Sequence, residues 1–220
     1  MTRIVLASCS PRRRELLARV GVRFAVAQPP DIELVPPPGM CSDLAVQLVA
    51  RAKALAVAQS QPAGTFVLSA DTIVVGPRGL LGKPLTAERA RDMLRQLSGT
   101  RHTVLTGVSA VAAPSGPEAL GVSRSAVKMR EIPNAELEAY VASGEPLDRA
   151  GGYAIQGGAG DWVEAVGGRV DNVVGMDVSL ALRLLAQVGY PVPLPSAADI
   201  PLVPRSVRRP LSPLRPAGRV

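Results

Sequence analysis

Hydroxyl and guanidinium groups gather between the first apolar run and the first helix-forming segment, in Ser8-Cys9-Ser10-Pro11-Arg12-Arg13-Arg14. A helix N-terminus presents unpaired N–H donors and a partial positive charge, and arginine suits phosphate oxygens especially well. The segment therefore indicates an anion site. An ordinary helix cap followed by solvated arginines would contain the same residues.

Carboxylates that could bind a metal ion or activate water follow a second apolar run and occupy an earlier loop. Asp71 comes directly after the strand-like segment Phe66-Val67-Leu68-Ser69-Ala70. Ligands usually bind at strand ends in α/β sheets, and an aspartate there can hold Mg²⁺ or take a proton from water. Asp31 and Glu33 alternate in loop 29–39, so both project to one side of an extended chain. Taken alone, each acid could equally be a turn or loop residue.

Two lysines and a glycine-rich segment supply further candidates. Lys83 lies in Gly82-Lys83-Pro84, which is not a Walker A loop but could aim an ammonium at a phosphate. Lys53 lies on an expected helix, where a solvated surface lysine is the alternative. Within 151–160 the glycines permit close backbone approach, and Gln156 can pair with an amide-like base edge. An ordinary glycine-rich turn is again the alternative. His102, Tyr153 and Trp162 are expected to pack inside the protein.

These candidates need strands and helices to position them. Strands are expected at 4–8, 24–27, 65–75, 104–112 and 122–130. Helices are expected at 11–20, 42–60, 86–97, 134–142 and 179–187, with cap residues such as Ser10 and Thr86 at their starts. In helix 42–60 the expected buried stripe is Leu44, Leu48, Ala52, Leu55 and Ala56. Alternating strands and helices predict an α/β fold with a mixed sheet.

Composition limits the class of protein. The 220 residues are 47% hydrophobic, enough for one sizeable core. No run approaches the roughly 18 to 20 apolar residues of a membrane span. The first apolar run is too short for a secretory signal, so we expect a cytoplasmic protein with no membrane partner. Cys9 and Cys41 lack metal-site spacing, and a disulfide is not expected in that compartment.

Positive charge is concentrated at the C-terminal end. Of the net +7, residues 191–220 carry +4, from five arginines and Asp199, together with eight of the 21 prolines. We therefore expect a core domain over 1–190 and a mobile extension over 191–220. Because the excess charge lies in this extension, the high pI does not indicate a specific nucleic-acid partner.

Several short motifs occur in a characteristic order over about residues 3–189. They are Leu6-Ala7-Ser8-Cys9-Ser10-Pro11-Arg12-Arg13, Ala70-Asp71-Thr72, Leu81-Gly82-Lys83-Pro84, Leu97-Ser98-Gly99, Thr106-Gly107-Val108, Asp148-Arg149-Ala150-Gly151-Gly152-Tyr153-Ala154-Ile155-Gln156-Gly157 and Asn172-Val173-Val174-Gly175-Met176. Together they resemble the Maf family of nucleotide pyrophosphatases. The extension has no counterpart in the family pattern.

The resemblance implies a fold like that of inosine triphosphate pyrophosphatases, with two lobes around a cleft. It implies hydrolysis of nucleoside triphosphates to monophosphate and pyrophosphate, with a divalent cation, Mg²⁺ or Mn²⁺. Asp71 would be the proton acceptor, and a homodimer is plausible by family analogy. The family's metal positions correspond here to Glu33 and Asp71, and its phosphate positions to Ser8, Arg13, Lys53 and Lys83.

Three residues match the branch of the family that acts on dTTP and UTP, namely Arg12, Thr72 and Gln156. The branch acting on 7-methyl-GTP typically has Glu in place of this Gln. Activity on 7-methyl-GTP or on a wider set of modified nucleotides therefore stays open. A non-enzymatic regulator of septum formation is the third alternative.

Overall fold

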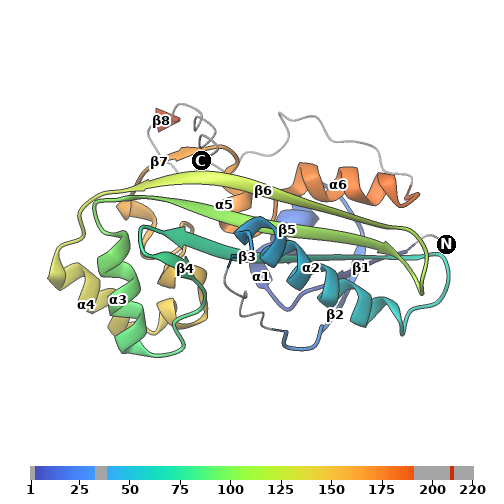
Figure 1. Cartoon of the computed structure of the whole chain (residues 1–220), viewed down its shortest axis with the longest axis horizontal. Helices are drawn as coiled ribbons and strands as arrows, with labels where there is room; N and C mark the ends of the chain where they lie inside the picture. Colours follow the sequence, from blue (N-terminus) through green and yellow to red (C-terminus); the bar gives the residue numbers. More distant parts are fainter. Residues whose placement is uncertain (1–2, 33–38, 191–208, 211–220) are drawn as a thin grey trace. The chain divides into compact units, whose positions relative to one another are not determined.

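The computed structural model describes residues 3–32, 39–190 and 209–210 (Figure 1). The helices are α1 (Pro11–Arg19), α2 (Ser42–Ala58), α3 (Ala87–Leu97), α4 (Asn134–Ala142), α5 (Val170–Val174) and α6 (Val178–Gln187), with 3-10 turns η1 (Glu145–Asp148), η2 (Ala150–Gly152) and η3 (Gly160–Trp162). The strands are β1 (Arg3–Ala7), β2 (Phe24–Ala27), β3 (Thr65–Gly76), β4 (Gly79–Leu81), β5 (Arg101–Ala112), β6 (Glu118–Met129), β7 (Val163–Gly167) and β8 (Arg209–Pro210). The sheet contains parallel and antiparallel pairs, which confirms the predicted mixed α/β class.

The chain divides into two compact units. Unit 1 comprises Met1–Thr72, Leu105–Ser123 and Asp171–Leu202, and unit 2 comprises Ile73–Val104, Arg124–Val170 and Val203–Val220. Strands β3, β5 and β6 each contribute residues to both units. Two units agree in number with the two predicted lobes, whereas the cleft between lobes stays a prediction.

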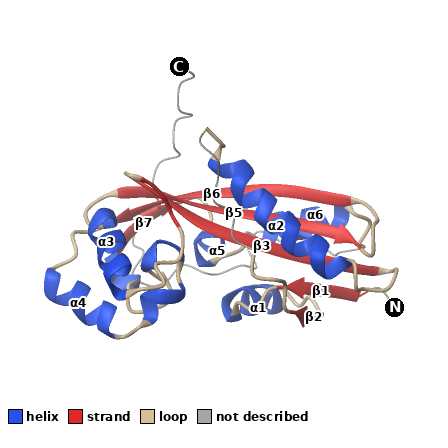
Figure 2. Cartoon of the chain, turned by 60° about the horizontal axis from the view of Figure 1, so that its bottom comes forward, coloured by secondary structure: helices blue, strands red, loops and turns tan. Residues whose placement is uncertain are grey.

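Unit 1 is built on parallel strands with a helix packed closely against them. Its strand neighbours run β2-β1-β3-β5-β6, and β1 pairs in parallel with both β2 and β3. Helix α2 lies along these strands (Figure 2) and shares a buried core with β1, β3 and β5. A Cβ added to Gly107 of β5 would lie 2.4 Å from the carbonyl oxygen of Val46 in α2. The helix backbone thus approaches the strand so closely that only glycine fits there.

This close approach explains why the predicted stripe on α2 is wrong. Leu44 is 49% exposed. The buried positions are instead Ala45, Val46, Val49, Ala50, Ala54, Val57 and Ala58. Small alanine and valine side chains let the helix sit near the strands, whereas leucines on that face would hold it away. The apolar pattern predicted the helix correctly. It assigned the buried face to leucines, whereas alanines and valines occupy that face.

Unit 2 combines antiparallel pairing with two helices. Strand β4 pairs with β3 and β7 pairs with β6, both antiparallel. Helix α3 begins at Thr86, whose Oγ1 accepts from the Arg89 N–H at 3.3 Å, as the sequence predicts. Helix α4 coincides with the predicted 134–142. The short elements β4, β7, α5 and the three 3-10 turns were not predicted.

Among the described residues, no helix combines the length and apolar character needed to cross a bilayer. Of the C-terminal extension the structure describes residues 209–210, which pair in parallel with β7 as strand β8. The other residues of 191–220 lie outside the described part, so the predicted mobility of this extension is untested.

Candidate functional site

The first segment of the site joins β1 to α1 in unit 1. Ser10 is the N-cap of α1 and Pro11 its first residue, as predicted, although the Ser10 side chain makes no capping bond. The capping geometry instead involves Ser8, which is 4% exposed and whose Oγ accepts from the Ser10 N–H at 3.2 Å. The tight connection brings the first turn of α1 beside the carboxyl end of β1.

Arg13 links this turn to two distant parts of unit 1. Its Nη1 donates to Ser8 Oγ at 3.4 Å, its Nη2 to Thr72 Oγ1 at 3.1 Å, and its Nε to the Gly175 carbonyl at 2.8 Å. Burial lowers the pKa of the Arg13 guanidinium, and the charge of Asp71 opposes that shift. A guanidinium has five N–H groups, so three hold the fold and two are left for a further partner such as a phosphate oxygen.

A chain of hydroxyl groups continues from Arg13. Thr72 Oγ1 lies 3.0 Å from Thr106 Oγ1, and Thr106 Oγ1 donates to the Asn172 carbonyl at 3.2 Å. The Thr72 hydroxyl has a single proton and two acceptors within reach, Thr106 Oγ1 and the Gly175 carbonyl at 3.3 Å. Arg13, Thr72 and Thr106 thus form one hydrogen-bonded network that ends on the Asn172 and Gly175 carbonyls.

The backbone carbonyls of α5 and of Gly175, the residue after it, accept most of these hydrogen bonds. Besides Asn172 and Gly175, the Val174 carbonyl accepts from Arg12 Nε at 3.3 Å. Helix α5 and Gly175 thus bind three of the predicted site residues, Arg12, Arg13 and Thr72, through backbone carbonyls.

Asp71 and Thr72 are consecutive residues of β3 with different partners, and the charge of Asp71 still acts on Arg13. Thr72 faces Arg13, whereas Asp71 faces α2 and accepts from Lys53 Nζ at 2.7 Å through Oδ1. The side chains of Lys53 and Asp71 are only 17% and 20% exposed. Lys53 lies one turn after the buried residues Val49 and Ala50 of α2 and is itself partly buried. A carboxylate can accept about four hydrogen bonds, which leaves Asp71 capacity for water or a cation.

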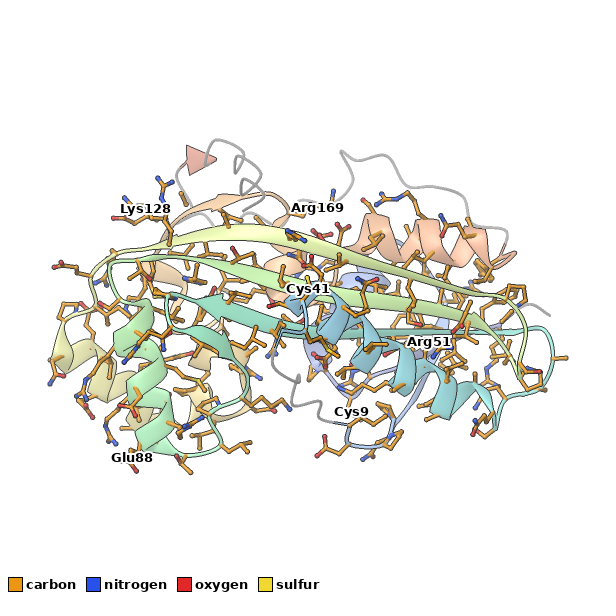
Figure 3. All side chains as sticks on the ribbon, in the orientation of Figure 1. Cys9, Cys41, Arg51, Glu88, Lys128 and Arg169 are labelled. Atoms are coloured by element: carbon orange, nitrogen blue, oxygen red, sulfur yellow. The ribbon has the colours of Figure 1, made fainter. Side chains whose placement is uncertain are left out.

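The side chains that could ligate the predicted divalent cation are few. Across the described part of the chain, no group of three or more His, Cys, Asp or Glu side chains could hold an ion. Mg²⁺ often binds through one or two carboxylates together with substrate phosphates. Asp71 fits this arrangement, while Glu33 lies outside the described residues. Cys9 and Cys41 are exposed free thiols (Figure 3).

Lys83 belongs to unit 2 and lies on the surface. Its Nζ contacts Asp148 Oδ1 at 2.6 Å, with the two side chains 51% and 72% exposed. The Gly82 carbonyl accepts from the Gly151 N–H at 2.9 Å, which ties the Gly-Lys-Pro turn to the glycine-rich segment. The backbone near Lys83 is therefore held, while its ammonium can exchange Asp148 for another anion.

Gln156, also in unit 2, is exposed and directly follows the buried residues Tyr153, Ala154 and Ile155. In the same unit, His102 Nε2 lies 2.7 Å from the Tyr153 hydroxyl, and both side chains are buried. Burial lowers the pKa of His102 to about 4 and raises that of Tyr153. This agrees with the prediction that His102 and Tyr153 pack inside the protein, as does Trp162, which is 3% exposed.

The structure therefore brings six predicted residues together in unit 1 and places two in unit 2. The former are Ser8, Arg12, Arg13, Lys53, Asp71 and Thr72, and the latter are Lys83 and Gln156. Sequence reasoning gave no role to Thr106 or Asp148. A threonine inside the apolar strand segment 104–112 could have indicated a buried hydrogen bond, because a buried hydroxyl needs a partner. Asp148 offered no comparable signal, since its partner is distant in sequence.

Comparison with known proteins matches residues 3–188 to a family described as Maf-like protein. A dTTP/UTP pyrophosphatase of Anaeromyxobacter dehalogenans is 48% identical over 196 residues, covering 87% of this chain and 96% of that protein. One of Myxococcus xanthus is 46% identical over 192 residues, covering 87% and 95%. A HAM1 protein structure from Coxiella burnetii has 17% identity and a TM-score of 0.42, covering 60% of this chain and 75% of that one. A TM-score of this size does not establish a common fold.

Proposed function

The chain belongs to the Maf family, and from this we propose that it is a nucleoside triphosphate pyrophosphatase that favours dTTP and UTP. The family match spans residues 3–188, and the relatives named dTTP/UTP pyrophosphatase cover 87% of the chain. Among the contacts of the structure, the Lys53–Asp71 pair at 2.7 Å carries the proposal. It places a carboxylate and an ammonium together at low exposure beside the Arg13 network.

In the proposed reaction, water attacks a phosphorus of the triphosphate and the α–β anhydride bond breaks. Asp71 takes the proton of the attacking water, while Lys53 holds the carboxylate in position. The two free N–H groups of Arg13 and the ammonium of Lys83 offset the charge of the phosphates. Monophosphate and pyrophosphate leave as products.

Asp71 and Glu33 would hold the divalent cation, Mg²⁺ or Mn²⁺, together with phosphate oxygens of the nucleotide. Bound there, such a cation polarises the phosphate oxygens and lowers the pKa of a coordinated water. The chain's own contribution is to orient Asp71 through Lys53 and to keep the Arg13 cluster in place.

Base selection is assigned to Gln156, Thr72 and Arg12. Uracil and thymine offer O4 as an acceptor and N3–H as a donor, and the glutamine amide can pair with both. An ionised glutamate offers only acceptors and would suit the donor edge of guanine. The Thr72 hydroxyl and the Arg12 Nε already form hydrogen bonds within unit 1. We therefore propose that these two residues shape the site, and that Gln156 forms the hydrogen bonds to the base.

The test is pyrophosphate release from dTTP, UTP, CTP, GTP, ATP and 7-methyl-GTP, with Mg²⁺ and with Mn²⁺. We expect the highest kcat/KM on dTTP and UTP. Gln156→Glu should lower the UTP to 7-methyl-GTP ratio by roughly 5- to 150-fold, the effect of one unpaired buried polar group. Gln187→Glu, the same change at an exposed position of α6, is the matched control.

Each alternative has its own outcome. A wild type that prefers 7-methyl-GTP would overturn the branch assignment. No pyrophosphate release from any nucleotide with either metal would favour the non-enzymatic alternative. An unchanged ratio in Gln156→Glu would show that this side chain does not contact the base.

A further inference from the structure

Glu145, at the start of η1 in unit 2, is bonded to two separate parts of its surroundings. Its Oε1 accepts from the Tyr140 hydroxyl of α4 at 3.2 Å, and its Oε2 accepts from the Gly158 backbone N–H at 3.2 Å. The carboxylate therefore joins helix α4 to the glycine-rich segment two residues after Gln156.

Gly157 packs directly against this carboxylate. A Cβ added to Gly157 would lie 1.7 Å from Glu145 Oε1 and 2.7 Å from Glu145 Cδ. The turn itself is closed by the Gly157 N–H donating to the Ala154 carbonyl at 3.0 Å and the Gly160 N–H donating to the Gly157 carbonyl at 3.0 Å. The segment that carries Gln156 is thus folded directly against Glu145.

The other end of the contact is rigid. Tyr140 is 7% exposed, and its ring packs edge-on against Trp162, with ring centroids 4.9 Å apart. Trp162 Nε1 in turn donates to Glu136 at 2.9 Å. Burial, helped by the negative charge of Glu145, raises the pKa of Tyr140, so its hydroxyl keeps the proton that it donates. Glu145 is therefore bonded to a buried and fully protonated donor.

We infer that Glu145 is a positioning residue for Gln156, and that it sets the direction of the Gln156 amide by holding the Gly157–Gly158 backbone. This rests on the proposed function, in which Gln156 contacts the base. Gln156 is exposed, so the backbone beside it is what limits the directions its side chain can take. Holding a recognition group in place before binding lowers the entropy lost on binding.

The first test replaces the carboxylate. In Glu145→Ala we expect the ratio of kcat/KM on UTP to that on 7-methyl-GTP to fall about tenfold, mainly through a higher KM for UTP. Glu145→Gln should stay close to wild type, because its amide oxygen can accept from Gly158 and its amino group can donate to the Tyr140 oxygen. Glu164→Ala removes another half-exposed carboxylate of unit 2 and serves as the matched control.

A double-mutant cycle asks whether Glu145 acts through Gln156. In the Gln156→Ala background, Glu145→Ala should change the UTP to 7-methyl-GTP ratio less than twofold, because the side chain being positioned is gone. A tenfold effect that persists in that background would overturn the inference. So would a wild-type ratio in Glu145→Ala, provided the wild type discriminates between the two nucleotides.

A second cycle tests the contact without substrate. Gly157→Ala should displace the carboxylate and lower the denaturant midpoint, while adding little in the Glu145→Ala background, where the space is open. Fluorescence of Trp162, the sole tryptophan, reports on the Tyr140 contact in each variant. If the wild type shows no base preference, the proposed specificity fails, and additive effects of Gly157→Ala and Glu145→Ala on unfolding would then reject the contact as well.

Discussion

The predicted site residues of unit 1 and unit 2 are held in different ways. In unit 1, Asp71 is paired with Lys53, and Arg13 donates to Ser8, Thr72 and Gly175. In unit 2, Lys83 and Gln156 are exposed, and the surrounding backbone is held by other groups. Substituting the unit 1 residues should therefore lower both activity and stability. Substituting the unit 2 residues should alter substrate binding with little loss of stability.

Replacing Asp71 by Asn should have the largest effect. The change keeps the size of the side chain but removes the proton-accepting charge, so we expect turnover to fall by at least about 10²-fold. The denaturant midpoint should move little, since the amide oxygen still accepts from Lys53. Asp92→Asn, at an exposed position of α3, is the isosteric control. Wild-type turnover in folded Asp71→Asn would remove Asp71 from the mechanism.

Acid should weaken the buried framework of unit 2 through His102. Its folded pKa of about 4 lies below that of an exposed histidine, so the unfolded chain binds the proton first. The stabilisation is complete above about pH 6.5 and is lost as the pH falls, by about 3 kcal/mol on reaching about pH 4. The measurement is the free energy of unfolding against pH, compared with His102→Gln, which has no titrating group. Parallel pH curves for the two proteins would contradict this account.

The Arg13 cluster provides the sharpest test of the comparison. Arg13→Met keeps the aliphatic stem but removes one hydrogen-bond donor each from Ser8 Oγ, Thr72 Oγ1 and the Gly175 carbonyl. We expect a loss of about 2 kcal/mol in unfolding free energy, together with lower activity. Arg14→Met, at the adjacent exposed position, should change neither. A wild-type free energy of unfolding in Arg13→Met would mean that the site residues of unit 1 stabilise the fold no more than those of unit 2.

Lys83→Ala should have the smallest effect and only on binding. The ammonium is half exposed and paired with an exposed Asp148, so removing it should cost well under 1 kcal/mol of stability. We expect KM for UTP to rise about tenfold, since one charge contact to phosphate is lost. Lys128→Ala, which breaks the similar exposed pair with Glu164, controls for net charge. A large drop in melting temperature for Lys83→Ala would contradict the surface role.

Local chemistry in the sequence determined most element positions. Proline and serine at the start of α1, the Thr86 cap of α3 and the boundaries of α4 follow from preferences that act within a few residues. Asp71 was picked out by its place after an apolar run, although β3 continues through it to Gly76, and Thr72 was picked out by its match to the family branch. The short elements β4, β7 and α5 were not predicted, because segments of three to five residues show too little hydrophobic periodicity.

Tertiary structure alone decided which side of each element faces inward and which polar groups meet. Helix α2 buries alanines rather than Leu44 because Gly107 lets its backbone approach β5. Arg13 reaches Gly175 across 162 residues, and Glu145 accepts from the Gly158 N–H across 13 residues. Such contacts depend on distances set by packing of the whole unit, and no local preference encodes them. The residue types indicated which chemistry is possible. The packing determined which of these side chains stabilise the fold and which remain available to bind a ligand.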